Sequence, residues 1–303
     1  MRKILITGAT SMIGVALVEY LLAQDCEVTG LVRPHSEHIS RLPKHANLRI
    51  VEYELASILQ LSEFLEHNYD IMYHLAWANT GADRDKDVLG QIENIRLSLD
   101  ALELCSRIGC NTFVGAGSQA EFGPKTHGPI GRNSSEEPVT AYGICKSSAG
   151  KLVLSRGAEL GIRCFWPRIF SIFGPYDRGS SLISHTIQCL KQDKTLQLTK
   201  GTQIWDYLYV IDSAKALYLI GEKGIVGKKY CIGSGIGRPL HEYIDFIRSQ
   251  IKSTSEIRFG DIPFDENSVM YLIADIEELM EDTGFSPDYT FERGIKDMLE
   301  KKH

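Results

Sequence analysis

Short apolar runs alternate with amphipathic stretches over the first 170 residues. The apolar runs predict strands at Ile4–Ile6, Cys26–Val32, Leu48–Tyr53, Ile71–Leu75, Thr112–Gly115 and Ile162–Phe165. The stretches between them repeat their apolar residues with a helical period and predict helices at Ile13–Leu22, Ser57–His67, Asp85–Ile108 and Ala141–Leu160. This alternation predicts an α/β fold, in which a doubly wound parallel sheet carries helices on both faces.

The alternation of apolar runs and amphipathic stretches ends at about residue 170. Glycines and prolines, beginning with Gly174 and Pro175, divide the rest into shorter pieces. The sequence contains no clear linker and no internal repeat. We therefore expect the boundary to lie near residue 170 and the later elements to form a smaller lobe folded over the sheet.

Charge and cysteine content narrow the class of protein. The 303 residues include 33 Lys and Arg against 39 Asp and Glu, a net charge of −6. Nucleic acids and anionic membranes need a basic surface, so we expect neither as a partner.

The seven cysteines are odd in number and form no CxxC pair, which predicts reduced thiols and no metal site. There is no long apolar run and no signal-peptide pattern, so we expect a cytoplasmic protein.

The segment Ile4–Gly14 has the pattern of a strand, a glycine turn and the start of a helix. Gly8 permits the tight turn, and Gly14 lets the helix pack closely on the strand. Unpaired N–H groups at the start of such a helix bind the pyrophosphate of a dinucleotide. The expected cofactor-binding residues of this turn are Gly8, Thr10, Ser11, Met12, Ile13 and Gly14.

The same turn resembles the TGxxGxxG motif of the extended short-chain dehydrogenase/reductase family, with Ser11 at the middle glycine. That family contains sugar-nucleotide epimerases, dehydratases and ketoreductases. Later positions that match the family pattern imply further cofactor contacts at Glu54, Leu55, Leu75, Ala76 and Asn94. The resemblance implies an NAD(P)-binding Rossmann domain at residues 1–170. It also implies a mainly substrate-binding lobe at residues 171–303, partly interleaved with the first domain.

The end of the second predicted strand bears on the choice of cofactor. NAD enzymes usually place an acid there for the ribose 2′-hydroxyl. This strand ends at Val32, and Arg33 and Pro34 follow without an acid. Because an arginine pairs with a 2′-phosphate, we expect NADP, with NAD as the alternative in which Arg33 stacks on adenine or faces solvent.

Tyr142 and Lys146 are four residues apart, so they lie on one face of the predicted helix. A free phenol has a pKa of about 10, and a neighbouring ammonium lowers that pKa, so Tyr142 can exchange a proton with an alcohol or a ketone. Ser118, after the strand at Thr112–Gly115, matches the Ser/Thr that the family uses on the substrate oxygen. The resemblance therefore implies the catalytic set Ser118, Tyr142 and Lys146, with Tyr142 and Lys146 also binding the cofactor.

Gln119 and Ala120 occupy the positions where the 4,6-dehydratases of the family carry an Asp-Glu pair. Neither side chain can transfer a proton in the elimination of water. Glu121 comes one residue later and would point to another face of an extended chain. We therefore expect hydride transfer at one carbinol carbon and no dehydratase activity.

The segment from Arg168 to Pro175 resembles the family's RxxNxYGP turn, with Ser171 at the asparagine. A later stretch resembles GxxxRDFxYVxD, with Trp205 at the arginine that family members use on the substrate diphosphate. Trp205 either stacks on a base or sugar or belongs to the core. The expected substrate-binding residues are Gln119, Ser171, Arg178 and Trp205, with Arg178 as one cation that could replace the missing arginine.

These observations favour an NADPH-dependent reductase of a 4-keto nucleotide-sugar, with Tyr142 as the proton donor. One alternative is a nucleotide-sugar 4-epimerase that retains NAD. Another is a catalytically silent NADP-binding regulator on the same fold. The resemblance also implies a homodimer formed through the long helices near residues 85–108 and 141–160. The sugar, the nucleotide base and the stereochemistry stay open.

Overall fold

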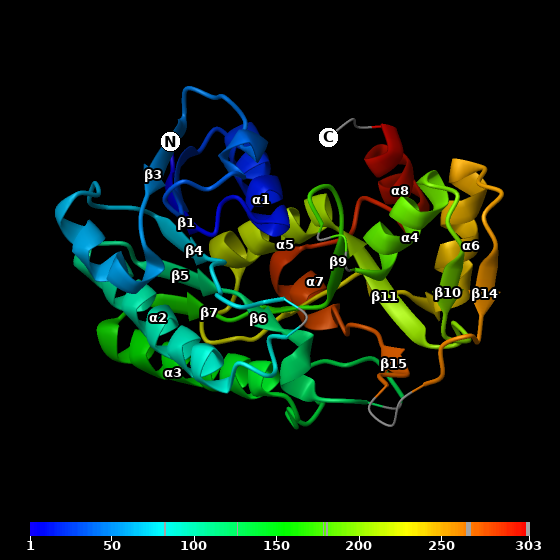
Figure 1. Ribbon diagram of the computed structural model, residues 1–303. Coiled ribbons are helices and arrows are strands. Elements are labelled where there is room, and N and C mark those ends of the chain that lie inside the picture. Colours follow the sequence, from blue (N-terminus) through cyan, green and yellow to red (C-terminus); the bar gives the residue numbers. More distant parts are fainter. Residues whose placement is uncertain (82, 126, 178, 180, 265–267, 301–303) are drawn as a thin grey trace.

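The computed structural model describes residues 1–303 except 82, 126, 178, 180, 265–267 and 301–303. Its centre is a six-stranded parallel sheet with the strand order β3-β2-β1-β4-β5-β7 (Figure 1). The strands are β1 (Lys3–Thr7), β2 (Glu27–Val32), β3 (Leu48–Glu52), β4 (Ile71–His74), β5 (Thr112–Gly115) and β7 (Arg163–Phe165). The expected α/β fold is thereby confirmed. The strand order reverses between β1 and β4, and ligands of such sheets bind beyond the carboxyl ends of the strands at this point.

Helices cover both faces of this sheet. Helices α1 (Met12–Ala23) and α5 (Val210–Lys223) pack together on one face, and α2 (Val88–Arg107) and α3 (Ala141–Leu160) pack together on the other (Figure 1). Side chains of β1 alternate accordingly, with Ile4 and Ile6 in one buried cluster and Leu5 in the other. Helix α5 comes from the second half of the chain, so the two halves are interleaved in space.

Two predicted helices differ in the structure. The stretch predicted as a helix at Ser57–His67 is a 3₁₀ helix, η2 (Leu55–Glu63), with non-helical backbone at Ser57. Its buried residues Ile58 and Leu61 are three apart, which suits the three-residue turn of a 3₁₀ helix. The helix predicted from Asp85 begins at Val88, because the Asp87 carboxylate caps it by accepting from the Gly90 N–H at 3.1 Å.

Most of the elements that follow residue 170 form the lobe on the right of Figure 1. A four-stranded sheet there contains β9 (Ser171–Phe173), β11 (Ile204–Tyr209), β13 (Gly237–Pro239) and β15 (Tyr271–Leu272). A parallel pair lies beside it, β10 (Leu196–Leu198) with β14 (Ile257–Phe259). The lobe's helices are α4 (Leu182–Lys191), α6 (Leu240–Ile251) and α8 (Phe291–Glu300), whereas α7 (Glu277–Thr283) packs against α5 in the centre of the molecule.

A third small sheet joins the lobe to the main sheet. It consists of β6 (Gly117–Ser118), β8 (Arg168–Ile169) and β12 (Cys231–Ile232). Two short 3₁₀ helices, η1 (Ile39–Arg41) and η3 (Gln119–Phe122), follow β2 and β6. Among the described residues, no helix is both long and apolar enough to span a bilayer. The same residues contain no group of three side chains suited to hold a metal ion.

Candidate active site

The turn between β1 and α1 has no room for larger residues at its two glycines. Gly8 has a φ of +71°, and a Cβ there would lie 2.9 Å from the Ala76 nitrogen. A Cβ on Gly14 would lie 2.3 Å from the Gly8 carbonyl oxygen. Ser11 is the N-cap of α1, and its hydroxyl accepts from the Gly14 N–H at 3.0 Å. The serine at the family's middle glycine therefore has a defined role in starting the helix.

The start of α1 suits the pyrophosphate of a dinucleotide. The first turn of the helix carries no acidic residue, so nothing there opposes an anion. Thr10, Ser11, Met12 and Ile13 lie at this end. The Ser11 N–H donates to the Gly8 carbonyl at 3.0 Å, whereas the N–H groups of Met12 and Ile13, in the first turn, have no helical partner. The close approach at Gly8 and Gly14 keeps this backbone accessible to a ligand, so the residues fit NAD(P).

The end of β4 lies beside the glycine turn. Thr7 Oγ1 accepts from the Ala76 N–H at 3.1 Å and lies 2.9 Å from His74 Nδ1. Burial lowers the pKa of His74 to about 3, so its imidazole is neutral. The Asn94 amide, on α2, accepts from the Ala78 N–H at 2.8 Å and donates to the Ala78 carbonyl at 3.0 Å. Asn94 therefore holds the segment that follows Leu75 and Ala76.

Two arginines follow β2, the strand that pairs with β1. Arg33 is exposed directly after β2. Glu54 is also exposed and comes immediately before Leu55, the first residue of η2. Arg41, which sequence reasoning missed, donates to the Thr10 carbonyl at 3.4 Å. Its guanidinium also lies 5.0 Å from the centre of the Tyr176 ring. No local motif marks Arg41, because its partners lie 31 and 135 residues away along the chain.

The structure brings Ser118, Tyr142 and Lys146 together beyond the carboxyl end of β5. Thr140 caps α3 by accepting from the Gly143 N–H at 3.1 Å, which fixes the helix that carries Tyr142 and Lys146. Burial raises the pKa of Tyr142, whereas a hydrogen bond with Ser118 and the charge of Arg84 lower that pKa. The phenol is thus linked to the serine, as a proton-transfer site requires.

Lys146 is buried, and its ammonium is held by backbone and by aromatic rings. Its Nζ donates to the Ala116 carbonyl at 2.7 Å and lies 3.5 Å from the centre of the Trp77 ring. The same Nζ is 5.8 Å from the centre of the Tyr142 ring. Burial lowers the pKa of Lys146 to about 7, against the attraction of Glu121, which raises it. The ammonium therefore loses its charge near neutral pH in the unliganded protein.

Three residues of the segment between β4 and α2 surround Tyr142, and sequence reasoning missed all of them. The Trp77 ring packs edge-on against Tyr142, with centroids 6.1 Å apart, and its Nε1 donates to the Gln91 side chain at 2.8 Å. The Arg84 guanidinium lies 4.2 Å from the centre of the Tyr142 ring. The Asp85 carboxylate accepts from the Tyr142 N–H at 3.1 Å.

Glu121 lies beneath this site in a buried network. Its carboxylate accepts from the Ser118 N–H at 2.9 Å and from Trp166 Nε1 at 3.0 Å. It also forms an ion pair with Arg168, N to O 3.0 Å. These partners are part of the protein core, so the carboxylate supports the backbone at Ser118.

The expected substrate-binding residues that the structure describes lie in the lobe and at its border. Trp205 Nε1 donates to the Ser171 hydroxyl at 2.7 Å, so these two residues contact each other. Gln119 is the first, half-buried residue of η3. Arg178 lies outside the described residues. Arg238, a further cation of this lobe, is paired with Glu292.

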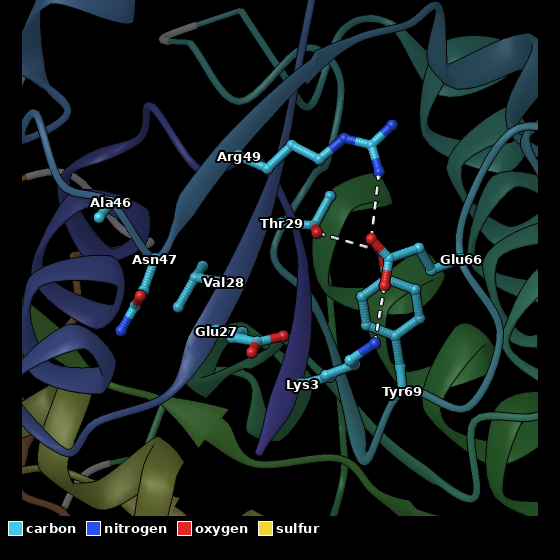
Figure 2. Close-up of a pocket in the computed structure, with 9 residues that line it drawn as sticks. All are labelled: Lys3, Glu27, Val28, Thr29, Ala46, Asn47, Arg49, Glu66 and Tyr69. Atoms are coloured by element: carbon cyan, nitrogen blue, oxygen red, sulfur yellow. Dashed lines mark hydrogen bonds and ion pairs between the residues drawn. The ribbon is translucent and has the colours of Figure 1, made fainter. Parts of the chain in front are cut away.

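A surface hollow of about 180 Å³ lies elsewhere and does not belong to this site. Figure 2 shows its charged lining, in which Glu66 pairs with Lys3 at 2.7 Å and Arg49 at 3.6 Å. Lys3 and Glu27 are the first residues of β1 and β2. The hollow therefore lies at the amino ends of the strands, opposite the edge that carries Tyr142.

Curated relatives match this chain over nearly its whole length. CDP-abequose synthase of Salmonella muenchen is 25% identical over 308 residues, which cover 99% of this chain and 98% of that protein. UDP-glucose 4-epimerase of Corynebacterium glutamicum is 24% identical, covering 97% and 93%. dTDP-glucose 4,6-dehydratase 1 of Escherichia coli K12 is 26% identical, covering 98% and 92%.

Solved structures share the fold. The UDP-N-acetylglucosamine 4-epimerase of Methanobrevibacter ruminantium M1, in complex with UDP-N-acetylmuramic acid, superposes with a TM-score of 0.90 at 22% identity, covering 99% of this chain and 97% of that one. The UDP-glucuronic acid 4-epimerase of Bacillus cereus, in complex with NAD, gives 0.83 at 22% identity, covering 97% and 96%. The pattern of the NAD dependent epimerase/dehydratase family matches residues 4–233. The chain belongs to the NAD dependent epimerase/dehydratase family.

Proposed function

We propose that this protein is an NAD(P)-dependent oxidoreductase that reduces the 4-keto group of a nucleotide-sugar. The observation that carries the proposal is that Ser118, Tyr142 and Lys146 lie together beyond the carboxyl end of β5. The names of the relatives, which include CDP-, UDP- and dTDP-sugar enzymes, support a nucleotide-sugar as the substrate.

In this mechanism each residue has a separate task. The bound cofactor supplies the hydride, and the residues at Gly8–Gly14 would hold its pyrophosphate. The Ser118 hydroxyl, which bonds Tyr142 in the unliganded protein, donates its hydrogen bond to the ketone oxygen and so places that oxygen beside the phenol. Tyr142 gives its proton to that oxygen as the alcohol forms. The Lys146 ammonium, when charged, favours the phenolate that remains.

NADP is the proposed cofactor. Arg33 is exposed at the end of β2, and Arg33 and Pro34 stand where an NAD enzyme usually places an acid for the ribose 2′-hydroxyl. Arg41 adds a second positive charge on the same side, next to Thr10. Two guanidinium groups attract a 2′-phosphate, because arginine pairs with phosphate through charge-assisted hydrogen bonds.

We further propose that the protein does not eliminate water from its substrate. The side chains of Gln119 and Ala120 do not ionise and cannot act as acid or base, and the nearby Glu121 carboxylate is engaged by Arg168 and Trp166. dTDP-glucose 4,6-dehydratases occur among the relatives, so incubation with dTDP-glucose tests this point directly. We expect no 4-keto-6-deoxy product.

A reaction assay separates reduction from epimerisation. Purified protein is incubated with UDP-, CDP- and dTDP-linked 4-keto sugars and either NADPH or NADH. We expect one 4-hydroxy product per NADPH oxidised, and a kcat/KM for NADPH about tenfold or more above that for NADH, since a charged hydrogen bond contributes about 1.5–3 kcal/mol. Interconversion of two 4-epimers without net cofactor consumption would instead establish the epimerase alternative, and no turnover with any substrate would favour the regulator.

We also propose a homodimer through α2 and α3. Apolar side chains stand exposed there, with Leu89 at 80%, Ile92 at 51% and Ile144 at 48%. The double variant Leu89→Glu/Ile92→Glu is expected to sediment as a monomer, because charges replace apolar contact area. The control is Ile225→Glu, since Ile225 is equally exposed, at 51%, but lies after α5. A wild-type protein that sediments as a monomer would contradict the proposal.

A further inference from the structure

The strongest unassigned feature is an arginine on the face of the proposed proton donor. Arg84 belongs to the segment between β4 and α2, 58 residues before Tyr142. Its guanidinium lies 4.2 Å from the centre of the Tyr142 ring. A cation at this distance from an aromatic face is attracted by the ring quadrupole. The contact fixes one face of the phenol.

Neighbouring bonds hold Arg84 in this place. Asp85 Oδ1 accepts from the Tyr142 N–H at 3.1 Å, an N–H of the first turn of α3 that has no helical partner. Arg84 Nε lies 3.5 Å from Asp85 Oδ2, so Asp85 links the Arg84 side chain to the start of α3. Upstream, Asn94 binds both backbone polar groups of Ala78. The segment is therefore tied down on both sides of Arg84.

The charge of Arg84 acts on both members of the Tyr142–Lys146 pair. It lowers the pKa of Tyr142, against burial and against the charges of Glu121 and Asp85, which raise that pKa. It also lowers the pKa of Lys146, after the larger effect of burial. The groups that face Lys146 from the surrounding elements are His74, Trp77, Arg84, the Ala116 carbonyl, Glu121, Tyr142 and Trp166. Of the two charges that act on Lys146, the Glu121 carboxylate raises its pKa and the Arg84 guanidinium lowers it.

We propose that Arg84 is a positioning residue of the active site. It holds the Tyr142 ring by its face, and its positive charge favours loss of a proton from both Tyr142 and Lys146. The proposal rests on the role of Tyr142 given above. It adds a residue outside the Ser-Tyr-Lys set, on a segment that the reaction would otherwise not use.

Titration of Lys146 in the unliganded protein tests the electrostatic half of the proposal. The protein is labelled with [ε-¹³C]lysine, and the Lys146 signal is assigned by its loss in Lys146→Met. Arg84→Gln is expected to raise the pKa of Lys146 from about 7 by roughly one unit. Arg84→Lys should keep this pKa near its wild-type value, because the charge is retained. Lys86→Gln is the matched control, since Lys86 is exposed and pairs with Asp83 at 2.7 Å.

Steady-state kinetics test the positioning half. Arg84→Gln is expected to lower kcat about tenfold with little change in KM, a loss within the range of a cation–π contact. The fall of kcat at high pH should move to higher pH, because Tyr142 keeps its proton longer when the arginine charge is gone. Arg84→Lys should recover part of kcat.

The outcomes separate this proposal from the proposed function. If folded Arg84→Gln matches Lys86→Gln in both the pKa of Lys146 and kcat, the role of Arg84 is refuted and the reductase proposal stands. If Arg84→Gln moves the pKa of Lys146 but Tyr142→Phe leaves activity intact, the electrostatic contact is real and the proposed mechanism is wrong. A fall in kcat without any change of that pKa or of the pH profile would reduce Arg84 to a structural residue.

Discussion

Tyr142→Phe is expected to lower kcat by about 10³-fold, within the range that a positioned acid or base contributes. The substitution removes the proton donor but keeps the ring. Trp77 packs on that ring with centroids 6.1 Å apart, and Arg84 lies 4.2 Å from its centre. Lys146 is held by the Ala116 carbonyl, which the substitution does not touch. The loss should therefore appear in kcat, with cofactor affinity within about threefold of wild type and unchanged stability.

The measurement is kcat from initial rates of NADPH oxidation, with cofactor affinity from fluorescence titration. The control is Tyr69→Phe, which removes a hydroxyl that donates to Thr29 Oγ1 at 3.1 Å in the hollow of Figure 2, away from the site. Its kcat should stay near that of wild type. If Tyr142→Phe retains more than a tenth of wild-type kcat, another group donates the proton.

The sequence predicted the parts of the site that depend on local spacing. Tyr142 and Lys146 are one helical turn apart, and Gly8 and Gly14 stand where a strand meets a helix, so both patterns are visible without a structure. The sheet could also be predicted, because each strand is a compact apolar run. The 3₁₀ helix η2 was missed because its apolar spacing of three also occurs in an α-helical pattern.

Contacts between distant segments could not be predicted in this way. Asp85 and Tyr142 are 57 residues apart, and their hydrogen bond depends on how the loop after β4 passes over α3. Trp205 and Ser171 meet because β9 and β11 pair in parallel, with Ser171 opposite Tyr207. The sequence marked both residues as departures from a family pattern, but only the sheet register shows that the two departures contact each other. The indole N–H is thereby satisfied inside the protein.

We expect the largest loss of stability from a substitution in the buried network under Ser118. Glu121→Ala is expected to lower the free energy of unfolding by about 3 kcal/mol, because the buried Arg168 loses one of its two carboxylate partners. Glu121 is fully buried, and the Arg168 side chain is 5% exposed. The substitution also removes the acceptor of the Ser118 and Trp166 N–H groups. Arg168 keeps its second partner, Glu136, which limits the loss.

Urea denaturation of Glu121→Ala and Glu103→Ala measures this difference. Glu103 forms an ion pair of similar length with Arg156, 2.7 Å, but its side chain is 33% exposed and that of Arg156 is 42% exposed. An exposed pair of this kind contributes about 0–1 kcal/mol. Equal losses in the two variants would contradict the role given to burial. A larger loss for Glu121→Ala would show that the carboxylate one residue beyond the dehydratase position stabilises the fold beneath Ser118.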